Sequence, residues 1–86
     1  MLEQAVLISF HAPWCAPCKA MAPIVKEIIS TSGLKLVDVD VDEDVELAIE
    51  YKVRAIPTLI LVKDNHEVGR LIGSQSAEQL KKFIHR

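Results

Sequence analysis

Cys15 and Cys18 are the strongest candidates for catalytic residues in this sequence, because of their reactive side chains and their spacing. They are the only two cysteines among 86 residues, and they stand with two residues between them where an apolar run meets a helix-like run. A Cys-X-X-Cys pair in that setting suits reversible thiol–disulfide exchange. Cys15 would lie at the helix N-terminus, where unpaired backbone N–H groups favour a thiolate, and Cys18 would lie about one turn further along and be more buried. We therefore expect Cys15 to attack a substrate disulfide and Cys18 to resolve the mixed disulfide.

Length and composition restrict the class of protein. Half of the residues are hydrophobic and 26% are charged, which is typical of one small globular domain over residues 1–86. The formal net charge of −2 provides no basic field for nucleic acid or an anionic membrane. The sequence lacks a basic N-terminal patch and the apolar run Ala5–Phe10 is short, so we expect neither a signal peptide nor a membrane span. We expect a cytoplasmic monomer, and in a reducing cytosol a cysteine pair is more often catalytic than structural.

The pattern of apolar residues predicts the elements that position the two cysteines. Ala5–Phe10 is typical of a strand buried on both faces, and helical spacing follows from Cys15 to Ser30. Period-two alternation then predicts a strand over Leu34–Val41. The remaining expected elements are a short helix through Tyr51, strands over Thr58–Lys63 and Glu67–Ile72, and a last helix that Ser76 caps.

This order has a preferred arrangement in space. The first two strands should be parallel through a right-handed crossover, and the last two should form an antiparallel hairpin, with helices on both faces of the sheet. The cysteines then follow the carboxyl end of the first strand, where open α/β sheets usually bind ligands.

Further motifs surround the cysteines at characteristic distances. They comprise Phe10-x-Ala12-x-Trp14-Cys15-x-Pro17-Cys18-Lys19, Pro23, Asp40-x-Asp42, Arg54-x-Ile56-Pro57-Thr58 and Gly73. Over nearly its whole length the sequence resembles the thioredoxin family. The resemblance implies an α/β, thioredoxin-like fold with a central mixed four-stranded sheet flanked by three helices (β-α-β-α-β-β-α), lacking the family's usual N-terminal strand and helix. The strand over Leu34–Val41 would then be an edge of the sheet, and one face would carry a single helix.

The resemblance also implies roles for residues around the cysteines. Ile56-Pro57 is similar to the family's cis peptide bond, which places the Ile56 backbone where an extended substrate segment can pair with it. Asp42 would accept a hydrogen bond from the Trp14 indole. The expected substrate-binding residues are Trp14, Ala16, Pro17, Ile56, Pro57, Ile72 and Gly73.

Ser9 and Asp38 stand at two positions near the cysteines that differ from the family's pattern, and both positions concern proton transfer. Ser9 stands where the family commonly buries an aspartate, and a serine hydroxyl is no base near neutral pH. Our hypothesis is that Asp38, on the neighbouring strand, supplies the carboxylate that accepts the Cys18 proton, with burial raising the pKa of Asp38. The alternative is a solvated aspartate on an edge strand without a catalytic role.

His11 stands where the family typically has an aromatic residue, four positions before Cys15. We favour a structural role, in which the imidazole fills the site and hydrogen-bonds to backbone. Electrostatic tuning of the thiolate, or proton transfer, is the alternative.

The cysteine motif indicates a function. Ala16-Pro17 resembles the Gly-Pro of the family's reducing branch, so we expect a protein-disulfide reductant supplied with electrons by an external NADPH-dependent flavin reductase. We expect no bound cofactor and no metal, since a zinc site on the cysteines would need two further ligands and only His11 is near in sequence. Two alternatives remain: a non-enzymatic binding module or accessory subunit that uses the same groove, and a glutaredoxin-like enzyme acting on glutathione adducts.

Overall fold

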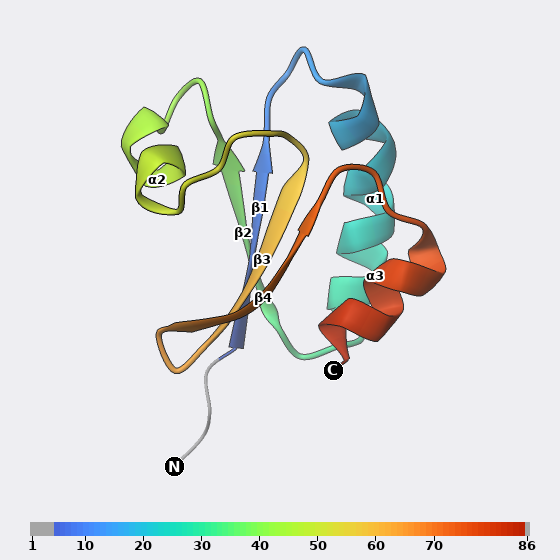
Figure 1. The fold of residues 1–86 in the computed structure, drawn as a ribbon. Coiled ribbons are helices and arrows are strands. Elements are labelled where there is room, and N and C mark those ends of the chain that lie inside the picture. The colour runs from blue at the N-terminus through green and yellow to red at the C-terminus, as the bar shows by residue number, and fades with distance from the viewer. Residues whose placement is uncertain (1–4, 86) are drawn as a thin grey trace.

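Strand β1 (Ala5–His11) lies inside a four-stranded sheet on which the rest of the chain is built (Figure 1). The computed structural model describes residues 5–85. The fold class and the order of elements predicted from the sequence are confirmed. The other elements are α1 (Ala16–Ser30), β2 (Lys35–Asp40), α2 (Val45–Glu50), β3 (Thr58–Lys63), β4 (His66–Ile72) and α3 (Ala77–Ile84).

The strands pair in the order β2-β1-β3-β4. β1 runs parallel to β2 and antiparallel to β3, and β3 and β4 form an antiparallel hairpin. Asp64 and Asn65 join the hairpin strands with φ values of 52° and 67°, as a two-residue turn of the type I′ class requires. β2 is an edge strand, as expected.

The two faces of the sheet are covered unequally (Figure 1). Helices α1 and α3 pack on one face, where Leu7 of β1 meets Val25 and Leu80 from the helices. On the other face Ile8 and Phe10 of β1 pack with residues of α2. β1 is therefore buried on both faces, because its successive side chains enter different cores.

Four connections meet at one end of the sheet, the end shown uppermost in Figure 1. β1, β2 and β4 end there, and β3 begins there because it runs antiparallel to β1. This geometry brings the Cys15 segment, the Asp42 turn, the Ile56-Pro57 segment and Gly73 to the same place, although they are distant in sequence.

Candidate active site

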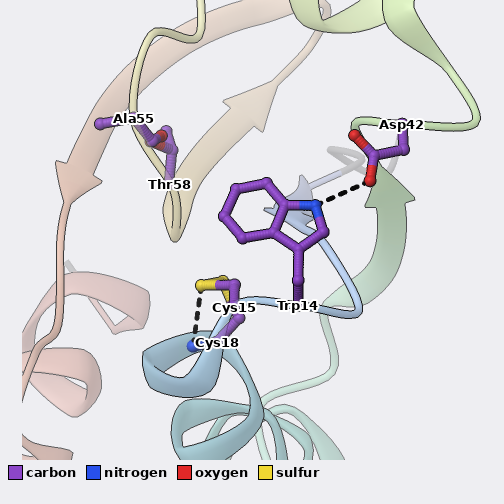
Figure 2. The surroundings of a disulfide bond; sticks show 6 residues. All are labelled: Trp14, Cys15, Cys18, Asp42, Ala55 and Thr58. Atoms are coloured by element: carbon purple, nitrogen blue, oxygen red, sulfur yellow. Dashed lines mark hydrogen bonds between the residues drawn. A yellow bond between two sulfur atoms is a disulfide. The ribbon is translucent and has the colours of Figure 1, made fainter.

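Cys15 and Cys18 are joined by a disulfide, with their Cα atoms 5.3 Å apart (Figure 2). Cys15 is the N-cap of α1, and its Sγ accepts a hydrogen bond from the Cys18 N–H at 3.3 Å. None of the described residues in the first turn of α1 is acidic. After reduction, a Cys15 thiolate would retain this donor and the positive end of the helix dipole, which lowers the pKa of a thiol. The geometry favours Cys15 as the attacking sulfur.

The expectation that Cys18 would be more buried than Cys15 is wrong. The two residues are 6% and 5% exposed. Both sulfurs lie in one small apolar cluster with Ala12, against which Val41 and Ile56 pack. The position of each cysteine along the helix therefore does not determine its burial. Burial depends on the neighbouring loops that contribute Val41 and Ile56.

The Trp14 side chain lies beside the disulfide and is 69% exposed. Its indole N–H donates to Asp42 Oδ2 at 2.8 Å (Figure 2), as the resemblance implied. Asp42 is held in turn, because its own N–H donates to Asp40 Oδ1 at 2.9 Å. An exposed tryptophan fixed in this way offers a large apolar surface to a partner at low cost in side-chain entropy.

The segment opposite Trp14 carries the Ile56–Pro57 peptide bond, which is cis as expected. The Thr58 hydroxyl donates to the Ala55 carbonyl at 2.6 Å and closes this turn. Thr58 is the one fully buried polar side chain among the described residues, at 1% exposure. The sequence motif included Thr58 but did not reveal this role; a hydroxyl at the first position of a buried strand was the available signal.

The remaining expected binding residues lie around the same segment. The Gly73 N–H donates to the Pro57 carbonyl at 2.8 Å, so β4 ends directly beside the cis bond. Ile72 is exposed and pairs with Thr58 in the sheet. Ala16 and Pro17 are exposed at the start of α1. All seven expected residues are therefore at this end of the sheet.

A hollow of about 180 Å³ adjoins Trp14. Sequence reasoning missed most of its walls, although Val41 could have been placed there from the period-two pattern of its strand. Its lining residues are Trp14, Val41, Ala48, Val53, Arg54, Ala55 and Ile56.

Asp38 lies on β2 next to Ser9 of β1 in the sheet register. Its side chain is 49% exposed, so the burial that we expected to raise its pKa is absent. The reason is its place on an edge strand. Asp38 nevertheless lines a cavity with Ser9 and Cys18, and its Oδ1 lies 3.8 Å from His11 Nε2. Its role in proton transfer remains a prediction.

His11 is 33% exposed and faces that carboxylate. His66 and His85, by contrast, are exposed at the start of β4 and at the end of α3.

Metal-ligating side chains are scattered over residues 5–85. Within this range, no three or more His, Cys, Asp or Glu side chains gather in a way that could hold a metal ion. None of the helices in the described part of the chain has the length and apolar character needed to cross a membrane.

Comparison with known proteins agrees with this geometry. The family model for Thioredoxin matches residues 1–86. Thioredoxin from Bacillus subtilis is 42% identical over 86 residues, covering 98% of this chain and 83% of that protein. Mitochondrial thioredoxin from Mus musculus is 36% identical over 86 residues, and the chain spans 52% of its length.

Solved structures agree as well. Mitochondrial thioredoxin 3 from Saccharomyces cerevisiae superposes with a TM-score of 0.87 at 38% identity, over 94% of this chain and 76% of that one. Fasciola hepatica thioredoxin has a TM-score of 0.89 at 34% identity, over 96% of this chain and 82% of that one. The chain belongs to the thioredoxin family, and it is a thiol–disulfide oxidoreductase.

Proposed function

We propose that this protein reduces disulfides of other proteins in the cytoplasm and receives its electrons from an external NADPH-dependent flavin reductase. The observation that supports this most is the Cys15–Cys18 disulfide at the start of α1, flanked by the exposed Trp14. A protein substrate can rest on Trp14 on one side and on the Ile56-Pro57 segment on the other. The protein itself needs no bound cofactor for this exchange.

The reaction follows from the two sulfurs. The Cys15 thiolate attacks one sulfur of the substrate disulfide, and the other sulfur leaves as a thiolate. Cys18 then loses its proton and attacks the Cys15 sulfur, which releases the second substrate sulfur. The substrate gains two electrons, and the Cys15–Cys18 disulfide forms again.

Single substitutions at each cysteine test this assignment. A reductase-coupled assay would follow NADPH consumption with a disulfide-containing protein such as insulin. Cys15→Ser should abolish both the coupled reaction and any covalent adduct, because the attacking sulfur is gone. Cys18→Ser should abolish turnover but accumulate a mixed disulfide at Cys15, visible by mass spectrometry. An adduct on Cys18 in the Cys15→Ser variant, with turnover retained, would contradict the assignment.

The Cys15→Ser, Cys18→Ser double variant addresses the binding-module alternative. Neither cysteine lines the hollow beside Trp14. A binding module would keep its biological activity in the double variant, whereas a reductase would lose it.

A further inference from the structure

A cavity of about 260 Å³ lies between α1 and the sheet, and it shares no lining residue with the hollow beside Trp14. It reaches Cys18 but not Cys15, and its polar lining includes Ser9, His11 and Asp38. A space of this size has room for several water molecules, since one occupies about 30 Å³ in the liquid. Cys18 therefore has a solvent-sized chamber beside it, in which polar side chains from β1 and β2 interrupt a mainly apolar lining.

The sheet register explains why these polar groups share the chamber. Leu7 and Leu36 pack into the core under α1, and side chains two residues apart on a strand point to the same face. Ser9 and His11 continue that face on β1, as Asp38 does on β2. The apolar stripe under α1 thus becomes polar towards the end of the sheet where Cys18 lies.

Within this chamber, His11 Nε2 and Asp38 Oδ1 lie 3.8 Å apart. Their side chains are 33% and 49% exposed, so solvent can exchange protons with them. The other charged groups around the chamber are Lys19 and Lys26 from α1, which line the same cavity, and Asp40, the register neighbour of His11 on β2.

We propose that His11 accepts the Cys18 proton through solvent in this chamber, and that Asp38 acts as a positioning residue for the imidazole. The inference rests on the disulfide exchange described above and concerns only its second step. An imidazole is the side chain that ordinarily exchanges protons between about pH 5 and 8. The Ser9 hydroxyl cannot do so, and Asp38 lies within 3.8 Å of the imidazole, where a carboxylate can orient it.

Protons and electrons balance in this step. The Cys18 thiol gives its proton to His11, and the resulting thiolate forms the bond to Cys15 Sγ while the bond from Cys15 to the substrate sulfur breaks. The substrate leaves as a thiolate, and the imidazolium returns its proton to solvent or to that thiolate. Asp38 stabilises the imidazolium while it exists.

The test distinguishes the reaction of Cys15 from that of Cys18 by their kinetics. Reduced protein is mixed with an excess of a chromogenic aromatic disulfide, whose released thiolate is coloured. The first phase reports attack by Cys15 and depends on reagent concentration, whereas the second phase reports resolution by Cys18 and does not. Absence of both phases would contradict the disulfide-exchange function itself, separately from this inference.

The pH profile of the second phase decides between the possible proton acceptors. In the unmodified protein, the rate of the second phase should rise with pH and level off within the imidazole range, about pH 5–8. In His11→Phe, which keeps an aromatic ring there, the inflection should disappear and the rate at neutral pH should fall by about 100-fold or more. Asp38→Asn should lower the rate several-fold but keep the inflection. His66→Phe removes an exposed imidazole and is the matched control, with an unchanged profile.

Three results would overturn the inference. In the first, His11→Phe has the profile of the unmodified protein, which would make His11 structural. In the second, the inflection disappears in Asp38→Asn and remains in His11→Phe, which would make Asp38 the acceptor. In the third, both phases slow equally in His11→Phe, which would place the effect on Cys15. If His11→Phe does not fold, His11→Gln is measured with the same criteria.

Discussion

The Thr58 hydroxyl is expected to fix the position of the cis Ile56–Pro57 segment against the disulfide. It donates to the Ala55 carbonyl at 2.6 Å from a site that is 1% exposed. Thr58→Val replaces the hydroxyl by a methyl group of nearly the same size. A carbon atom approaches a carbonyl oxygen only to about 3.3–3.6 Å, so the turn should open by about 0.7–1 Å.

The energetic and functional effects can be estimated separately. Loss of the hydrogen bond costs about 0.5–1.5 kcal/mol, and each kcal/mol lowers the Tm of a domain of this size by about 4–8 °C. A displacement of about 1 Å at a reacting site can cost up to about 100-fold in rate. We expect the reductase-coupled rate with a protein disulfide to fall by about tenfold. The rate with a small aromatic disulfide should change little, because that reagent does not need to pair with the Ile56 backbone.

Thr58→Ser is the matched control, since it retains the hydroxyl and loses only a buried methyl group. That loss costs about 0.8 kcal/mol, so the serine variant should be destabilised but should keep the rate with the protein substrate. The reasoning is refuted if the serine and valine variants lose the same activity, or if Thr58→Val reduces the protein substrate at the original rate.

Three further changes concern stability and groove geometry. The hydrogen bond from Arg70 holds the pKa of Glu67 below its ordinary value, so this pair stabilises the fold above the carboxyl's unfolded pKa and the effect is lost as pH falls. In urea unfolding, the free energy of unfolding of Glu67→Gln should therefore be lower than that of the unmodified protein by less than about 1 kcal/mol at neutral pH, and the difference should vanish in acid. A difference that does not change with pH would contradict this. Ser76 forms a capping box with Gln79, so Ser76→Ala should cost about 1 kcal/mol in the same assay, whereas Ser74→Ala, a control outside the capping box, should cost almost nothing. Gly73 has a φ of 89°, and a Cβ added there would meet no atom within 4 Å beyond its two chain neighbours. Gly73→Ala should therefore lower the free energy of unfolding by about 1–2 kcal/mol through the backbone alone, and Gly73→Asn should lower it less. Equal losses in the two variants would point to a steric cause.

Most of the fold could be predicted from the sequence because its apolar pattern is unambiguous. Ala5–Phe10 is a short apolar run, and its length is typical of a strand buried between two cores. The helix that Ser76 caps and the hairpin of the last two strands could also be predicted from local sequence. The sequence motif identified Trp14 and its Asp42 partner through the resemblance, and both occur as expected.

What could not be predicted depends on how elements overlap in space. Period-two alternation puts Asp38 on the face that α1 covers, but it does not tell how far α1 extends over an edge strand. Asp38 therefore proved exposed. The equal burial of Cys15 and Cys18 likewise depends on Val41 and Ile56, which pack from other connections.

The central claim is that the Cys15–Cys18 disulfide is a reversible donor of electrons at a reducing potential. Trp14 is the only tryptophan and adjoins Cys15, so its fluorescence should report the state of the disulfide in a series of thiol–disulfide buffers. We predict one reversible two-electron transition with a midpoint near the thioredoxin value of about −270 mV. A midpoint near the value of about −120 mV typical of a strong oxidant, or no reversible transition at all, would contradict a role as a reductant.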